Sequence, residues 1–214
     1  IIKSVAAFID RQQIATVSER VHPRSLFGIE SSFVEDNPNK VQEYSKDKNI
    51  DPLKQIKIFT NHKAGKAGRG RWYIVDRNVI AKEKHVYINK WKVIVSSANS
   101  AGQKRDWQLE IIDNMSAVGR VRVILGSFDT KLEATNFFRY VNTYLIRFMF
   151  LMTGDALRSL GKKVPDLQDY SANQNLLDFT KDINDQLYEL IGLKSDEIQY
   201  VEKKIKDIDA SRSK

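Results

Sequence analysis

The sequence predicts an α+β fold, with a mixed β-sheet, one long packed helix and a helical C-terminal tail. Three observations lead to this class. Short runs rich in Val, Ile, Trp and Tyr alternate with turn residues in the middle of the chain, which is typical of strands. After residue 128 the apolar period changes from two to 3.6, and two further helical patterns follow near the C-terminus. With 214 residues, 42% of them hydrophobic, the chain can bury a sizeable core.

The N-terminal part is predicted to hold one helix followed by a long irregular stretch. Val5, Phe8 and Ile14 recur at helical spacing, which predicts a helix over residues 4–17. Residues 22–53 hold three of the four prolines and are predicted to be loop-like. Four strands are then expected, over residues 71–75, 91–96, 108–112 and 120–127.

The strand over residues 120–127 shows the clearest alternation. Val121, Val123 and Leu125 fall on one face, and Arg120 and Arg122 fall on the other. We therefore expect a half-buried strand that offers its arginines to solvent or to a ligand.

The C-terminal half is predicted to be helical. Thr130 and Glu133 have the spacing of a capping box, and a wide apolar stripe then predicts one long helix over residues 133–152, packed on the sheet. Two more helices are expected over residues 175–190 and 195–208, the second with Ser195 as its N-cap. The chain is accordingly divided into an α+β domain at 1–172 and a helical tail at 173–214.

The net charge of +8 comes from one stretch of the chain. Residues 54–122 hold fifteen basic and five acidic residues, whereas the segments before and after each have a net charge of −1. A concentrated basic block is typical of a surface that binds a polyanion, most often nucleic acid and less often an anionic membrane surface. The alternative is a solvated basic face.

Composition excludes several classes of protein. The chain has no cysteine, so a disulfide scaffold, a thiolate zinc site and a cysteine nucleophile are ruled out. No window approaches the length of uncharged apolar sequence that a membrane span requires. The chain begins Ile1-Ile2-Lys3 without a signal-peptide pattern, and we expect a cytoplasmic segment of a longer protein.

The motifs of common enzymes are missing from the sequence. There is no Pro-Pro-aromatic loop of the kind that holds a flipped base, no G-x-G-x-x-G fingerprint, and Arg71-Trp72 stands where a P-loop needs Lys-Ser/Thr. The three histidines lack metal-ligand spacing. We therefore expect no catalytic, cofactor or metal site here. The alternative is a Mg²⁺-dependent nuclease that uses Asp166, Glu202 and Lys204, although Glu202 lies in a helical pattern.

Two polar segments carry residue types that contact DNA. The glycine-rich run 62–71 places cations on a backbone that can approach phosphates closely. The segment 96–107 carries amide and arginine side chains of the types that pair with adenine or guanine edges in the major groove; a plain hydrophilic hairpin is the alternative. The candidate DNA-binding residues are Lys63, Lys66, Arg69, Arg71, Trp72, Arg77, Asn99, Gln103, Lys104, Arg105, Trp107, Arg120 and Arg122.

The order of these motifs resembles the TaqI-like C-terminal specificity domain of adenine-specific DNA methyltransferases and type II restriction-modification enzymes. The similarity covers about residues 18–170. It is carried by Tyr73-Ile74-Val75-Asp76-Arg77, by Asn89-Lys90-Trp91-Lys92-Val93-Ile94-Val95-Ser96-Ser97, by the helix containing Arg139-Tyr140-Val141-Asn142-Thr143-Tyr144-Leu145-Ile146-Arg147-Phe148, and by Lys163-Val164-Pro165-Asp166-Leu167. Pro23-Arg24-Ser25-Leu26-Phe27-Gly28 is similar to the run that precedes this domain in the family, with Pro and the basic residue displaced.

The resemblance implies a domain that recognises a sequence in double-stranded DNA. In such proteins a catalytic domain on the same parent chain methylates adenine with S-adenosylmethionine, and some parents also cleave DNA with Mg²⁺. The segment 96–107 would read the bases, although it is less glycine-rich than in the family. Two alternatives from other classes are a protein-interaction module that docks through residues 175–208 and an RNA-binding domain, for which the basic segments carry few paired aromatics.

Overall fold

The computed structural model describes residues 1–63, 70–97, 109–152, 160–172 and 176–212. It confirms the α+β class with a mixed sheet. The helices are α1 (Ile2–Gln12), α2 (Phe33–Asp36), α3 (His85–Ile88), α4 (Lys131–Val141), α5 (Tyr144–Leu151), α6 (Ile183–Ile191) and α7 (Ser195–Arg212). The strands are β1 (Val41–Glu43), β2 (Gln55–Asn61), β3 (Gly70–Asp76), β4 (Trp91–Ser96), β5 (Glu110–Ile112), β6 (Ser116–Val118) and β7 (Arg122–Phe128).

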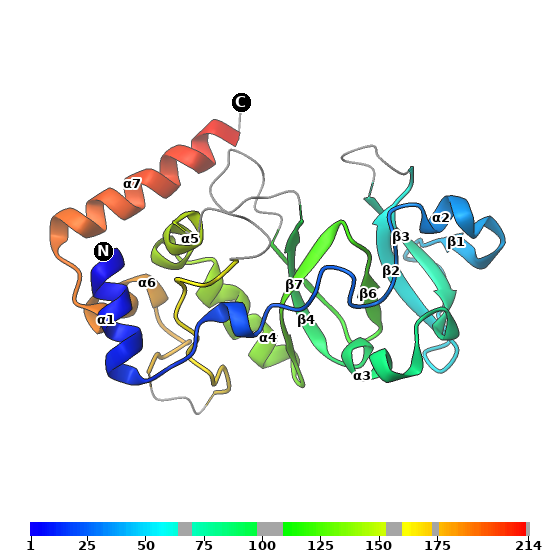
Figure 1. Ribbon diagram of the computed structural model, residues 1–214, viewed down its shortest axis with the longest axis horizontal. Coiled ribbons are helices and arrows are strands. Elements are labelled where there is room, and N and C mark those ends of the chain that lie inside the picture. The colour runs from blue at the N-terminus through cyan, green and yellow to red at the C-terminus, as the bar shows by residue number, and fades with distance from the viewer. Residues whose placement is uncertain (64–69, 98–108, 153–159, 173–175, 213–214) are drawn as a thin grey trace.

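The elements form three layers. A four-stranded sheet has the order β1-β3-β2-β6, and a three-stranded sheet has the order β5-β4-β7. The pair β2–β6 is parallel and the other pairs are antiparallel. Figure 1 shows the four-stranded sheet on one side of β4 and β7 and the helices α1, α4, α5, α6 and α7 on the other.

Three strands of the four-stranded sheet, β1, β2 and β6, were not predicted, and β1 lies within the stretch 22–53 that was expected to be loop-like. In β2, Ile56, Ile58 and Thr60 are buried, whereas Lys57 and Phe59 are half-buried on the opposite face. The apolar Phe59 interrupts the apolar-polar alternation in the sequence, because it packs edge-on against Trp72 of β3 with the ring centroids 5.3 Å apart. The predicted strand 71–75 is present as β3, one residue longer at each end.

The middle sheet is buried on both of its faces, which corrects the prediction of a half-buried strand over residues 120–127. Val93 and Val123 pack into the helical layer, whereas Ile94 and Ile124 pack against the four-stranded sheet. Each fully buried aliphatic side chain contributes about 1.5–3 kcal/mol. Arg120 lies before β7, and Arg122 begins it as a half-buried residue.

The predicted helix over residues 133–152 is present as two helices. The capping box of Thr130 and Glu133 starts α4 as expected. The chain then breaks at Thr143, which adopts extended dihedral angles as the N-cap of α5, while its hydroxyl donates to the carbonyl of Tyr140 at 2.8 Å. No Gly or Pro lies between residues 133 and 152, so the apolar stripe alone favoured one continuous helix.

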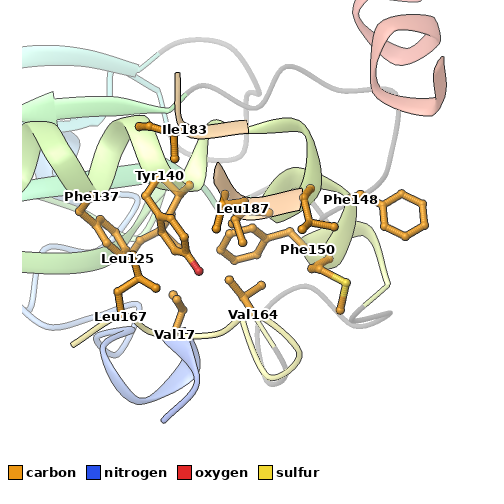
Figure 2. Packing of buried hydrophobic residues seen from close by; sticks show 14 of the residues in the cluster. Val17, Leu125, Phe137, Tyr140, Phe148, Phe150, Val164, Leu167, Ile183 and Leu187 are labelled. Atoms are coloured by element: carbon orange, nitrogen blue, oxygen red, sulfur yellow. The ribbon is translucent and has the colours of Figure 1, made fainter. Parts of the chain in front are cut away.

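The helical layer has an aromatic core. Figure 2 shows Phe137 and Tyr140 of α4 beside Leu125 of β7, with Phe150 of α5 close to Leu187 of α6. The hydroxyl of Tyr140 donates to the carbonyl of Pro165 at 2.7 Å, so its one polar atom is satisfied inside the core.

The C-terminal tail contributes to this same core. Val201 and Ile205 of α7 are 0% and 1% exposed and belong to the same hydrophobic cluster as Phe137. Two nitrogens of Arg147 donate to the carboxylate of Asp209 at 2.6 and 2.9 Å. The boundary drawn between 1–172 and 173–214 therefore does not separate two hydrophobic cores.

The ends of the helices follow local capping. α1 stops earlier than predicted because Gln13 takes a left-handed conformation with φ 52°. α6 begins at Ile183 rather than near 175 because the Asp182 side chain accepts from the Asp185 amide. Within the described residues, no helix combines the length and the apolar character that crossing a membrane would require.

Candidate nucleic-acid interface

The strand ends that flank both polar segments meet at one end of the two sheets. β2 ends at Asn61 opposite Gly70 of β3, and β4 ends at Ser96 opposite Arg122 of β7. Gly119 joins the two sheets there, because its amide donates to the carbonyl of Phe59 on β2 at 2.8 Å and its carbonyl accepts from the amide of Arg122 on β7 at 3.1 Å. We call this region, with Asn61, Gly70, Ser97 and Gly119 at its strand ends, the loop end (Figure 1).

Two glycines allow this close packing at the loop end. A Cβ on Gly119 would lie 2.7 Å from the hydroxyl oxygen of Thr60, and a Cβ on Gly70 would lie 2.5 Å from the ring of Phe59. Both distances are shorter than van der Waals contact. The glycines therefore let neighbouring strands and turns approach each other.

Two exposed arginines at the loop end are ion-paired with glutamates. Arg71 Nη1 donates to Glu43 Oε1 at 2.6 Å, and Arg120 Nη1 donates to Glu30 Oε2 at 2.7 Å. The hydrogen bond that Arg71 donates to Glu43 raises the pKa of Arg71 above its usual value. Exposed pairs of this kind contribute only about 0–1 kcal/mol, so a phosphate can replace the carboxylate.

Trp72 and Arg122 have a packing role in this structure. The guanidinium carbon of Arg122 lies 4.9 Å from the centroid of the Phe59 ring, and Trp72 packs against the same ring. Lys57 Nζ lies 5.9 Å from the Trp72 centroid. These half-buried side chains stabilise the sheet below the loop end.

Of the remaining candidates that are described, Lys63 lies at the loop end and Arg77 does not. Lys63 is exposed just beyond β2. Arg77 follows the far end of the seven-residue β3, about 20 Å away at 3.3 Å per residue. Its Nη2 donates to Asn89 Oδ1 at 2.5 Å, which ties it to the residue that follows α3.

Seven predicted residues lie outside the described residues: Lys66, Arg69, Asn99, Gln103, Lys104, Arg105 and Trp107.

Arg24 was not predicted as a site residue, although it connects Ser97, at the start of the segment 96–107, to the turn that holds Arg120. Its Nε donates to the Arg120 carbonyl at 2.7 Å, and its Nη2 donates to the Ser97 hydroxyl at 3.3 Å. These partners lie 96 and 73 residues away in the chain, so no local pattern could have indicated the contact.

The residues of the nuclease alternative have structural partners. Asp166 is 4% exposed and accepts from Arg20 Nε at 2.5 Å and from the Tyr170 hydroxyl at 3.0 Å. Glu202 lies on α7 and accepts from Lys206 at 2.7 Å, and Lys204 is exposed. In the part of the chain that the structure describes, no three acidic or histidine side chains are grouped as metal ligands.

The tail offers little apolar surface for the interaction-module alternative. Among its described residues, Tyr200 is the large hydrophobic side chain with high exposure, at 57%. The apolar faces of α6 and α7 are packed against α5 and α1.

Comparisons of the chain with protein-family models, with curated proteins and with solved structures found no match. A functional assignment therefore depends on the residues and geometry described above and on the order of motifs in the sequence.

Proposed function

We propose that this chain is a sequence-specific double-stranded DNA recognition domain of a bacterial restriction-modification enzyme. The observation that carries the proposal is that the described residues bordering both polar segments, 62–71 and 96–107, lie together at the loop end. The basic block of net charge +10 contributes Lys63, Arg71 and Arg120 there. A three-layer scaffold that brings the bordering residues of two polar segments to one end suits the reading of a groove.

The basic side chains that the structure describes at the loop end supply the sequence-independent part of DNA binding. Backbone phosphates are contacted by Lys63, Arg71 and Arg120. These contacts release counterions from the DNA, which provides affinity, and they also position the duplex. Asn99, Gln103 and Arg105, on the neighbouring segment, read base edges in the major groove.

The parent protein is proposed to be an adenine-specific DNA methyltransferase, acting in the cytoplasm and carrying a restriction endonuclease in some relatives. The motif order supports this part of the proposal. The parent's catalytic domain would hold S-adenosylmethionine, and its endonuclease, where present, would hold Mg²⁺. Its partners are double-stranded DNA and that catalytic domain.

The test is selection of bound duplexes from a randomised pool at physiological salt, where non-specific binding is weak. An enriched motif of several base pairs supports the proposal. Retention without enrichment leaves only a basic polyanion surface, and no retention at any salt overturns the proposal.

Point variants locate the surface on the molecule. Arg71→Gln and Arg120→Gln are each expected to weaken binding severalfold and to reduce the salt slope by about one. Lys54→Gln is the matched control, because it makes the same charge change on an exposed side chain at the far end of β2. Equal losses for Lys54→Gln would contradict a surface at the loop end.

Arg105→Ala should weaken binding to the enriched motif by about 1–3 kcal/mol while sparing the random pool.

A further inference from the structure

Two exposed arginines of the loop end, Arg71 and Arg120, each form an ion pair with a glutamate that lies earlier in the chain. The pairs Arg71–Glu43 and Arg120–Glu30 have N···O distances of 2.6 and 2.7 Å. All four side chains are about half exposed, from 44% to 55%, so solvent and ligands reach both members of each pair.

Backbone hydrogen bonds and strand pairing hold both glutamates in position independently of the arginine side chains. Glu30 follows Ile29, whose carbonyl accepts from the Arg120 amide at 3.2 Å. Glu43 lies on β1 opposite Tyr73 of β3, two residues along from Arg71. The next amide, that of Tyr44, donates to the Trp72 carbonyl at 3.0 Å. The carboxylates are therefore built into the scaffold beside the two guanidinium groups.

We propose that Glu30 and Glu43 limit the affinity of the loop end for DNA, because they compete with backbone phosphates for Arg120 and Arg71. This inference rests on the proposed function. A carboxylate and a phosphate both accept paired hydrogen bonds from guanidinium, so one replaces the other. A phosphate can bind only when the ion pair with the glutamate is broken. This cost reduces the sequence-independent affinity that phosphate contacts provide. Because these phosphate contacts are made on any sequence, the cost lowers specific and non-specific affinity alike and leaves the base contacts to distinguish sequences.

The experiment measures the affinity of the wild-type chain, Glu30→Gln and Glu43→Gln for a short fluorescein-labelled duplex pool of random sequence, by anisotropy over a salt series. Each variant is expected to bind about two- to fivefold more tightly, which is the strength of an exposed ion pair. The slope of log K against log salt should steepen by up to about one, because one more cation is available.

Two controls distinguish the loss of a particular ion pair from a change in the net charge of the chain. Glu83→Gln makes the same charge change on an exposed side chain beside α3, away from the loop end, and should alter affinity less. In an Arg120→Gln background, Glu30→Gln should have no more effect than Glu83→Gln. Thermal denaturation checks that every variant folds.

The outcomes distinguish this inference from the proposed function. If the wild-type chain binds the pool and the two variants match Glu83→Gln, the inference is overturned and the proposed function stands. If the wild-type chain binds no duplex at any salt, both are overturned. Tighter binding confined to Glu30→Gln and Glu43→Gln supports the inference and the placement of the DNA-binding surface at the loop end, while sequence specificity is tested by the selection experiment.

Discussion

Lys92 is an unusual residue, because it is a lysine with 0% exposure in the middle sheet. Its Nζ donates to the carbonyls of Ile88, Lys90 and Asp113 at 2.9, 2.5 and 3.2 Å. Burial lowers the pKa of Lys92 to about 7, although Asp113 acts in the opposite direction. The three carbonyls satisfy the ammonium group without restoring its hydration.

This pKa predicts that the chain becomes more stable as the pH rises. Between the folded pKa of about 7 and the usual value of 10.5, the unfolded chain binds a proton at Lys92 that the folded chain does not. The free energy of unfolding should therefore rise by about 1 kcal/mol per pH unit within that window. Urea denaturation at pH values from neutral to mildly alkaline measures the slope.

Lys92→Met should remove this slope, whereas Lys90→Met, which changes a partly exposed lysine two residues earlier, should leave it in place. A slope that Lys92→Met leaves unchanged would mean that another group titrates.

At the scale of elements, capping hydrogen bonds and helix breaks decide where each helix begins and ends, in addition to the apolar pattern. Thr130 and Glu133 begin α4 with reciprocal hydrogen bonds, the Glu133 amide donating to the Thr130 hydroxyl at 3.2 Å and the Thr130 amide to Glu133 Oε2 at 3.0 Å. Thr143 then separates α4 from α5, which lets both helices contribute to one aromatic core.

Loss of the capping box should destabilise the chain measurably. Thr130→Ala is expected to lower the free energy of unfolding by about 1 kcal/mol, because the Glu133 amide loses its acceptor. The melting temperature of a chain of this size should fall by about 2–4 °C.

Thr135→Ala is the control on the same helix, since its hydroxyl only donates back to the Lys131 carbonyl and alanine favours helix. A loss from Thr135→Ala as large as that from Thr130→Ala would contradict the capping role.

At the scale of the whole molecule, the three layers share two hydrophobic cores, and the C-terminal helices belong to the larger one. The amino group of Ile1 donates to Glu197 at 2.7 Å, so the start of α1 lies beside the first turn of α7. The tail therefore supports the same layer on which the middle sheet packs.

Ile205→Ala should destabilise the sheets as well as the tail. Ile205 is 1% exposed, and removing its side chain is expected to cost about 2–5 kcal/mol. Trp72 lies on β3 and Trp91 on β4, so tryptophan fluorescence during urea denaturation follows the sheets.

Lys204→Ala, the exposed neighbour, should change stability by no more than about 0.5 kcal/mol. A tryptophan transition that Ile205→Ala does not shift would mean that the tail unfolds independently.

The sequence by itself determined the features that depend on neighbours in the chain. The α+β class, the strand over residues 91–96 and the capping box at Thr130 follow from local period and turn chemistry, and the structure has all three. The break at Thr143 and the strand β2 escaped prediction, because an uninterrupted apolar stripe hid the first and the outward-facing Phe59 hid the second.

Only the tertiary structure decided how the basic block is arranged. Strand pairing brings Lys63, Arg71 and Arg120 to the loop end, and it places Arg77 at the opposite end of the sheet. It also sets Glu30 and Glu43 beside their arginines across 90 and 28 residues of chain. These pairings depend on the register of strands that are distant in sequence, and charge counted along the chain carries no information about register.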